Sequence, residues 1–207
     1  MEEDLVKTTY NKIAEKYSEK YFNDTSDLPF IDRFLSSLNI GSKILDVGCG
    51  VGNFTDYMLS KGFLAEGVDF SEEMVRIAKT KVPNGNFTVM DMRQLDFPNE
   101  TFEAVLAAYS IIHIQSQKIA DVLEEFKRIL KPNGKLGIIV QKGGPDKIVS
   151  EPLKPNEKLF INFFTKERLA DFLTKADFEI KQITEESSKD PESLSNLLIY
   201  VIAEKSV

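Results

Sequence analysis

The sequence predicts an α/β fold in which a mostly parallel sheet carries helices on both faces. From Lys43 onward, short apolar runs alternate with amphipathic stretches, which is typical of parallel strands joined by crossover helices. The last two apolar runs, Phe178–Thr184 and Leu197–Ala203, have no helix between them, which favours an antiparallel hairpin at the sheet edge. The 207 residues suit a single domain, since domains usually run to about 100–200 residues.

The first 40 residues predict two helices that cover a core formed by residues 41–207. Apolar and aromatic residues recur there every three or four positions and so share one helix face: Val6, Tyr10, Ile13, Tyr17 and Tyr21. A second helix is predicted over Pro29–Leu38, ending before Gly41.

The remaining elements follow in order. Strands are predicted at 43–47, 63–69, 86–90, 102–109 and 135–140, and helices at 53–61, from Ser71 to about 83, at 119–130 and at 165–175. Ser71 is a candidate N-cap for the helix that follows it. Pro132-Asn133-Gly134 is predicted to end the helix at 119–130. The stretch Gln141–Phe160, rich in glycine and proline, is predicted to be a loop that shapes a substrate pocket.

Composition excludes several classes of function. The net charge of −7 repels phosphate backbones, so we expect no nucleic-acid partner. One cysteine and one histidine cannot supply a disulfide, a Cys/His zinc site or an iron–sulfur cluster, so we expect no metal. The start at Met1 is acidic, and no apolar run approaches the ~18 residues of a membrane span. We therefore expect a cytoplasmic protein, and the sequence leaves its oligomeric state open.

The first strand runs into a glycine turn, Gly48–Gly52, at the edge where parallel α/β sheets bind ligands. A dinucleotide fingerprint would need glycine at position 53, which is Asn53. Asp46 would repel a diphosphate and suits a ligand with an ammonium group. A nicotinamide-dependent oxidoreductase is therefore the weaker alternative.

Two further strand ends carry carboxylates. Asp69 lies about 20 residues past Gly48, the spacing at which an acid accepts hydrogen bonds from ribose hydroxyls. Asp91 could accept a hydrogen bond from the amino group of an adenine, while Phe70, Met74 and Met92 could enclose the adenine ring. Ordinary core packing is the rival interpretation for Met74, and a helix N-terminal charge is the rival for Asp69. Together these residues describe a pocket for an adenosine that carries a charged amino acid and no phosphates.

These motifs closely resemble the class I S-adenosylmethionine-dependent methyltransferases, most of all the group that includes the ubiquinone and menaquinone biosynthesis enzymes. The resemblance covers about Ile44–Val140 and is carried by ILDVGCGVGNFT, GVDFSEEMV, VMDMRQLDFPNETFEAVLAAYSIIHI and RILKPNGKLGIIV. It implies a Rossmann-like seven-stranded sheet, S-adenosylmethionine as cofactor and a small-molecule methyl acceptor. The chain departs from the family at Asp177, where glycine is common, and at Glu103, where aspartate is common.

The cofactor-binding residues that we predict combine the strand-end chemistry with this resemblance. They are Tyr10, Tyr17, Asp46, Gly48, Cys49, Gly50, Asn53, Asp69, Phe70, Met74, Asp91, Met92 and Ala108. Tyr10 and Tyr17 could instead only dock their helix, and Cys49 is favoured as a small packing residue rather than a nucleophile.

His113 and Tyr109 are the catalytic candidates, because they follow the fourth strand at its ligand-facing end. Methyl transfer needs mainly alignment and exclusion of water, and a base only when the acceptor must lose a proton. His113 could be that base or a structural histidine packed among isoleucines. Tyr109 could approach the methyl group or pack in the core. A non-catalytic S-adenosylmethionine-binding protein is the second alternative function.

Overall fold

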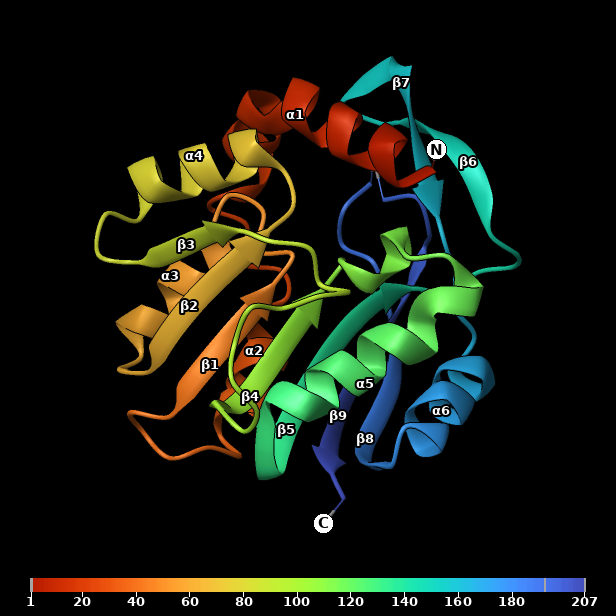
Figure 1. Cartoon of the computed structure of the whole chain (residues 1–207). Helices are drawn as coiled ribbons and strands as arrows, with labels where there is room; N and C mark the ends of the chain where they lie inside the picture. The colour runs from red at the N-terminus through yellow and green to blue at the C-terminus, as the bar shows by residue number, and fades with distance from the viewer. Residues whose placement is uncertain (1, 192, 207) are drawn as a thin grey trace.

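Seven strands of the described chain form one sheet in the order β3-β2-β1-β4-β5-β9-β8 (Figure 1). The computed structural model describes residues 2–191 and 193–206; Met1, Glu192 and Val207 lie outside them. β3, β2, β1, β4 and β5 run parallel, and β9 and β8 pair antiparallel at the edge. The predicted fold class is therefore confirmed.

The elements have the following bounds. The helices are α1 (Glu2–Tyr21), α2 (Leu28–Leu35), α3 (Asn53–Ser60), α4 (Glu72–Lys81), α5 (Ile119–Ile129) and α6 (Lys166–Lys175), with short 3-10 turns η1 (Ile111–His113) and η2 (Ser116–Lys118). The strands are β1 (Lys43–Val47), β2 (Leu64–Asp69), β3 (Asn86–Val89), β4 (Phe102–Ala108), β5 (Leu130–Gln141), β6 (Lys147–Glu151), β7 (Lys154–Ile161), β8 (Phe178–Ser187) and β9 (Leu197–Lys205).

Side chains of the central strands alternate between two cores, because successive residues of a strand point to opposite faces. In β1, Ile44 packs with Phe34 of α2 and Met58 of α3 in one core, while Leu45 belongs to the other, which includes residues of α5 and α6. Figure 1 shows α5 and α6 in front of the sheet and α2 and α3 behind it. The sheet order changes direction between β1 and β4, so the carboxyl ends of these two strands form the crevice where such folds bind ligands.

Two predictions about the second half of the chain are wrong. β5 begins at Leu130, which pairs with Phe102, and not at Lys135; the preceding helix ends at Ile129. Most of the expected loop Gln141–Phe160 is a separate two-stranded sheet, β6–β7. Its polar outer face lacks the apolar alternation of a half-buried strand; even Ile148 is 54% exposed.

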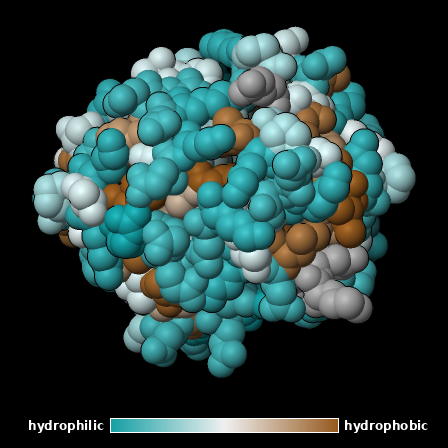
Figure 2. Space-filling view, turned by 90° about the horizontal axis from the view of Figure 1, so that it is seen from above, coloured by the Kyte–Doolittle hydropathy of each residue, from teal (hydrophilic) through white to brown (hydrophobic). Residues whose placement is uncertain are grey.

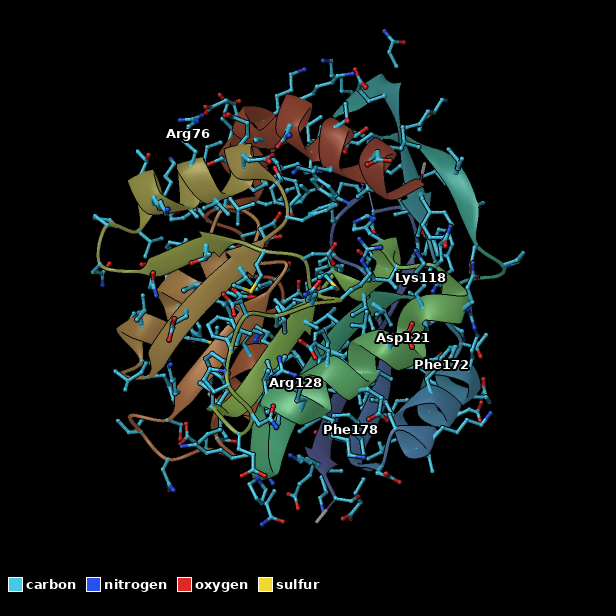
Figure 3. The ribbon with its side chains drawn as sticks, in the orientation of Figure 1. Arg76, Lys118, Asp121, Arg128, Phe172 and Phe178 are labelled. Atoms are coloured by element: carbon cyan, nitrogen blue, oxygen red, sulfur yellow. The ribbon has the colours of Figure 1, made fainter. Side chains whose placement is uncertain are left out.

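Helix α1 lies across the carboxyl end of the sheet, at the top of Figure 1, between α4 and the hairpin β6–β7. Thr9 donates a hydrogen bond to the Lys158 carbonyl of β7 (2.8 Å). On the other side, Arg76 of α4, labelled in Figure 3, pairs with Glu15 (2.6 Å). Seen from above, hydrophilic residues cover most of this face, with small apolar patches between them (Figure 2). The predicted aromatic face of α1 points the other way, toward the strand ends.

Two details of the described chain complete the fold. Asp177, where the resembling family often has glycine, has φ +56°, a left-handed conformation that glycine adopts without strain. Within residues 2–191 and 193–206, no helix has the length and apolar character that crossing a bilayer requires. The division into residues 1–40 and 41–207 stays a prediction.

Candidate active site

The turn after β1 needs glycine for two reasons. Gly48 has φ +72°, and a Cβ at this position would lie 2.3 Å from the Cβ of Ser110. The Gly48 and Cys49 amides both donate to the Val68 carbonyl of β2 (2.8 and 3.0 Å). The turn is therefore pressed between β2 and the end of β4, which leaves its backbone facing the space beyond the strands.

Asp69 connects this turn to the start of α4. Its Oδ2 accepts the Gly50 amide and its Oδ1 accepts the Ser71 amide, each at 2.9 Å. Burial raises the pKa of Asp69 to about 6, although these amide hydrogen bonds favour the charged form. Each carboxylate oxygen keeps a second lone pair that could accept a hydrogen bond from a ligand hydroxyl.

A first cavity of about 740 Å³, including its open mouth, lies over the glycine turn and beneath α1. Ten of the thirteen predicted cofactor-binding residues line it: Tyr10, Tyr17, Gly48, Gly50, Asp69, Phe70, Met74, Asp91, Met92 and Ala108. Both catalytic candidates, Tyr109 and His113, line it as well. Val47, Met90, Arg93, Ser110 and Ile114 also line it and were not predicted.

The unpredicted lining residues adjoin predicted ones, so extending each strand end by one or two positions would have found them. Ser110 is 5% exposed, and its Oγ has no hydrogen-bond partner among the described residues. This hydroxyl is a polar group that a ligand could satisfy.

Three predicted cofactor residues lie elsewhere. Asp46 is 1% exposed below the turn, where it accepts a hydrogen bond from Thr55 of α3 (2.7 Å); burial raises its pKa to about 7. Cys49 is buried and packs with Phe87, in agreement with small-residue packing, and burial raises the pKa of its thiol. Asn53 lines a different cavity. Sequence position alone does not show which way a loop side chain turns.

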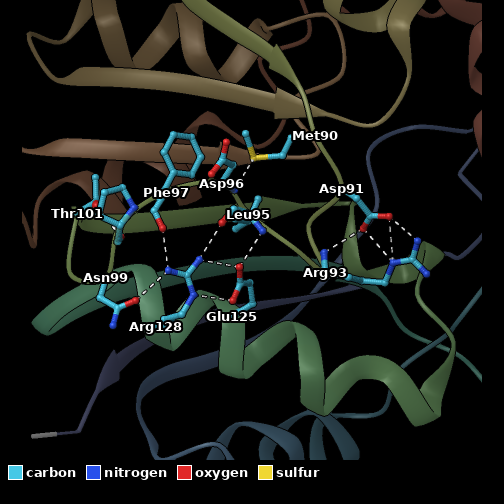
Figure 4. Close-up of polar contacts among 11 residues, drawn as sticks. Met90, Asp91, Arg93, Leu95, Asp96, Phe97, Asn99, Thr101, Glu125 and Arg128 are labelled. Carbon is cyan, nitrogen blue, oxygen red and sulfur yellow. Dashed lines mark hydrogen bonds and ion pairs between the residues drawn. The ribbon is translucent and has the colours of Figure 1, made fainter.

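Asp91 is held by its neighbour Arg93 (Figure 4). The Arg93 Nε and backbone amide both donate to Asp91 Oδ1 (2.9 Å), and an Arg93 terminal nitrogen donates to Oδ2. Burial favours a higher pKa for Asp91, but the hydrogen bonds and charge of Arg93 outweigh it and hold the pKa below its usual value. Asp91 thus stays ionised at the edge of the cavity.

A second cavity of about 970 Å³, including its open mouth, adjoins the first. Its lining comes from α1, the residues before α2, the start of α3, the segment after β4, the end of β5, the hairpin β6–β7, the segment between β8 and β9, and β9 itself. Four residues line both cavities and form the wall between them: Tyr10, Tyr17, Tyr109 and His113. A ligand in either cavity would contact this shared wall.

His113 and Tyr10 form a hydrogen-bonded pair within that wall. The His113 Nδ1 lies 3.0 Å from the Phe160 carbonyl, which can only accept, so Nδ1 carries the proton. Nε2 then accepts from the Tyr10 hydroxyl at 2.8 Å. Burial lowers the pKa of His113 to about 4, only partly offset by the carbonyl, so the imidazole is neutral at pH 7.

The site fits an adenosine bearing a charged amino acid. It combines a glycine turn that lines the cavity at Gly48 and Gly50, two carboxylates (Asp69 and Asp91) and apolar side chains that include Met74 and Phe70. Within the described residues, no group of three or more potential metal ligands is found.

Comparison with known proteins agrees with this geometry. Residues 44–134 match the family model described as a methyltransferase domain. The chain is 30% identical over 122 residues to the methyltransferase GfsG of Streptomyces halstedii, covering 55% of this chain and 43% of that protein. It is 29% identical over 150 residues to phosphoethanolamine N-methyltransferase of Plasmodium falciparum, covering 69% of this chain and 55% of that protein.

Residues 44–134 of the chain form a methyltransferase domain.

A solved structure has the same fold over nearly the whole length of this chain. The Burkholderia thailandensis 1,6-didemethyltoxoflavin-N1-methyltransferase, crystallised with 1,6-didemethyltoxoflavin and S-adenosylhomocysteine, has a TM-score of 0.77 at 19% identity. The match covers 99% of this chain and 88% of that chain. The chain spans about half the length of the curated relatives it matches. The predicted methyltransferase family is confirmed, and the ubiquinone- and menaquinone-like subgroup stays a prediction.

Proposed function

We propose that this protein transfers a methyl group from S-adenosylmethionine to a small organic acceptor. The observation that carries this proposal is the pair of cavities that meet at one aromatic wall. The first cavity has the chemistry of an adenosine and amino-acid site, and the second opens from the same wall, where a second reactant would meet the first. Two adjoining sites suit a transfer between two bound molecules better than a protein that only binds one.

The cofactor would be held by residues of the first cavity. Asp69 would accept from the ribose hydroxyls, and the ionised Asp91 from the adenine amino group. The Gly48–Gly50 backbone and the Ser110 hydroxyl would meet the amino-acid part. When bound, S-adenosylmethionine supplies a methyl group made electrophilic by its positive sulfur, and the C–S bond electrons stay on sulfur as the acceptor gains the methyl group.

The wall residues align the reactants and take up a proton. Tyr10 and Tyr17 are half-buried at the junction, where a bound cofactor would cover them and displace water, and the tyrosine rings would present π faces to a positive sulfur. Where the acceptor atom must lose a proton, the Tyr10 oxygen takes it while the Tyr10 hydroxyl proton passes to His113 Nε2. The Phe160 carbonyl accepts from Nδ1–H throughout and keeps the ring in place.

Ligand binding tests the cofactor assignment. S-adenosylhomocysteine at 100 times its dissociation constant should stabilise the protein by about 2.7 kcal/mol, measured as a rise in melting temperature, whereas NAD and NADP should not. Turnover is then followed with methyl-labelled S-adenosylmethionine and a panel of small acceptors. A protein that shows no shift with millimolar S-adenosylhomocysteine is not an enzyme of this kind.

Single-turnover rates test the proton pair once an acceptor is found. Tyr10→Phe and His113→Asn should each lower the rate about 10²- to 10⁴-fold with an acceptor that loses a proton. Cofactor affinity should stay within a few-fold. Near-normal rates in both folded variants would leave His113 as a packing residue.

A further inference from the structure

The second cavity is unusually rich in tyrosine. Five of the six tyrosines of the chain line it: Tyr10, Tyr17, Tyr21, Tyr109 and Tyr200. Aromatic faces attract cations, most strongly where water is excluded. The Lys20 ammonium already lies 4.7 Å from the centre of the Tyr21 ring, at the edge of this group. Such a cluster favours a positively charged guest over a neutral one.

A buried carboxylate faces the same cavity. Asp27 is 8% exposed and occupies the N-cap position of α2, yet its side chain caps no amide of that helix. Its Oδ1 instead accepts from the Tyr200 hydroxyl (2.7 Å) and its Oδ2 from the Tyr109 hydroxyl (3.0 Å). Within residues 2–191 and 193–206 no cation lies at ion-pair distance from Asp27, and the charge of Lys189 acts on it only from farther away. Burying a carboxylate without a cation is costly, and a cationic ligand would remove that cost.

The other charged groups of the lining make the cavity unfavourable for anions. Asp24, Glu151 and Asp190 add three carboxylates, and Asp190 pairs with Lys20 (3.1 Å). Among the described residues, Lys189 is the one cationic residue of the lining, and it donates to the Ser26 carbonyl (3.4 Å). With Asp190 paired to Lys20, three carboxylates and one lining ammonium are left, and this excess of negative charge would repel a phosphate or carboxylate ligand.

Gln141 provides an independent indication of a hydrogen-bond donor in the ligand. It ends β5, is 8% exposed and lines the second cavity. Its buried Oε1 has no hydrogen-bond partner among the described residues. A buried amide oxygen without a partner costs free energy, which a donating ligand group would recover.

The rest of the wall is apolar, with Ile112, Leu159, Ile161, Leu194 and Leu198 among its residues. From these observations, we propose that the methyl acceptor is an organic amine bound as its cation: Asp27, Gln141 and the tyrosine rings hold its ammonium group, and the aliphatic wall holds its carbon skeleton. The protonated nitrogen has no lone pair and serves only as the anchor. Another nucleophilic atom of the same molecule forms the bond to the methyl carbon as the C–S bond breaks, and any proton that this atom loses passes to the Tyr10 oxygen as the Tyr10 hydroxyl proton passes to His113 Nε2. The proposal rests on the proposed function, because it assigns the second cavity to the acceptor. Asp27 recognises charge here and takes no part in the transfer.

Binding to the wild-type protein saturated with S-adenosylhomocysteine tests the selectivity directly. Two matched sets serve as probes: phenethylamine, phenethyl alcohol and hydrocinnamate, and tryptamine, tryptophol and indolepropionate. Calorimetry should show the amine of at least one set binding ten-fold or more tightly than its alcohol and its carboxylate. Equal or tighter binding of the alcohol or carboxylate, or no binding of either amine at about ten millimolar, would overturn the proposal.

The variant Asp27→Asn then tests whether the ammonium group of the ligand binds at the Asp27 carboxylate. Amine affinity should fall about 10- to 150-fold, the range for hydrogen bonds to a charged group, while alcohol affinity changes less than about two-fold. Asp32→Asn makes the same charge change on the exposed side of α2, where Asp32 binds Tyr57, and should leave both affinities unchanged. Unaltered amine binding in folded Asp27→Asn contradicts the assignment.

Amine affinity measured in Gln141→Leu tests the proposal independently if Asp27→Asn does not fold. This substitution removes the buried acceptor and keeps the Asp27 carboxylate, so amine affinity should fall about three- to ten-fold; no fall in the folded variant contradicts the proposal.

The binding measurements also show which of the two proposals has failed. Loss of S-adenosylhomocysteine binding would contradict the proposed function, whereas normal cofactor binding without amine preference would contradict only the acceptor class.

Discussion

Gly48 and Ser110 meet so closely that each limits what the other can be. The 2.3 Å approach means that no side chain fits at 48 while Ser110 keeps its Cβ in place. The φ of +72° adds a second constraint that is independent of space. Since this contact joins the turn after β1 to the end of β4, it determines the shape of the first cavity.

Gly48→Ala should therefore be costly. We expect it to lower the free energy of unfolding by about 2–5 kcal/mol, from roughly 1–2 for the left-handed conformation and roughly 1–3 for overpacking. Gly41→Ala is the matched control, because Gly41 has φ +84° and no atom lies within 4 Å of the position that an added methyl group would take. This control should lose only about 1–2 kcal/mol. Urea unfolding measures both. Ser110→Gly in the Gly48→Ala background should restore part of the loss; no difference between the two alanine variants would contradict the steric argument.

The pH dependence of the proposed reaction should reflect the buried state of His113. Its pKa of about 4 keeps the imidazole neutral, and a base works only when it is deprotonated. The single-turnover rate at saturating cofactor should therefore be flat from about pH 6 to 8 and fall only as the pH drops toward about 4. Saturation matters because Asp69, with a pKa of about 6, and Asp46 beneath the glycine turn, with a pKa of about 7, would otherwise change cofactor affinity within this range. A rate that rises steeply between about pH 5.5 and 7 would show that His113 titrates near its ordinary value.

At the scale of elements, one arginine of α5 holds the segment that follows β3. Arg128 donates to the carbonyls of Leu95 (2.8 Å) and Phe97 (2.7 Å) and to Asn99, and it pairs with Glu125 (Figure 4). Figure 3 shows Arg128 on α5 in front of the sheet. This segment begins just after Asp91 and Met92, so the network supports one end of the first cavity.

Arg128→Ala should destabilise the protein by about 1.5–3 kcal/mol, because it removes several hydrogen bonds from a charged donor to partly buried acceptors. Arg33→Ala removes one exposed ion pair with Glu186 and should cost about 0–1 kcal/mol. Thermal or urea unfolding compares the two. Hydrogen exchange in residues 91–101 should also quicken in Arg128→Ala; equal stabilities and unchanged exchange would show that other contacts hold this segment.

The regular strands and helices were predictable because their signals are local. Apolar runs, the Ser71 cap and the glycine turn each lie within a few residues, and the strand-end rule then brought Asp69 and Asp91 into one cavity. Asp27 had no such signal. It occupies an ordinary capping position, and its actual partner Tyr200 lies 173 residues away. The hairpin β6–β7 was missed because its strands are mostly exposed and carry no apolar period.

At the scale of the whole molecule, α1 and the hairpin close the site together. Lys7 pairs with Glu72 of α4 (2.5 Å) and Lys12 with Glu157 of β7 (2.9 Å), so surface ion pairs join α1 to both neighbours. Exposed pairs of this kind contribute little stability each, about 0–1 kcal/mol. The cover over the two cavities is therefore held mainly by the buried face of α1.

Ligand binding should tighten this cover. Hydrogen exchange of the α1 amides should slow at least about ten-fold when S-adenosylhomocysteine saturates the protein, because Tyr10 and Tyr17 line the first cavity and gain a partner there. β8, the edge strand of the β8–β9 hairpin, should exchange at an unchanged rate and serves as the internal control. Protection confined to the glycine turn, with α1 unaffected, would show that α1 is not part of the cofactor site.

The separate pairing of β6 with β7 has an evolutionary consequence. The hairpin forms its own two-stranded sheet, so its residues lie outside the hydrogen-bonding ladder of the seven-stranded sheet. It nevertheless supplies Glu151, Leu159 and Ile161 to the second cavity and none of the lining of the first. Substitutions at these three side chains would alter the second cavity directly, and would reach the first only through the contacts of β7 with His113 and α1. A lineage of such proteins could thus diversify at one cavity while the lining residues of the other stay the same.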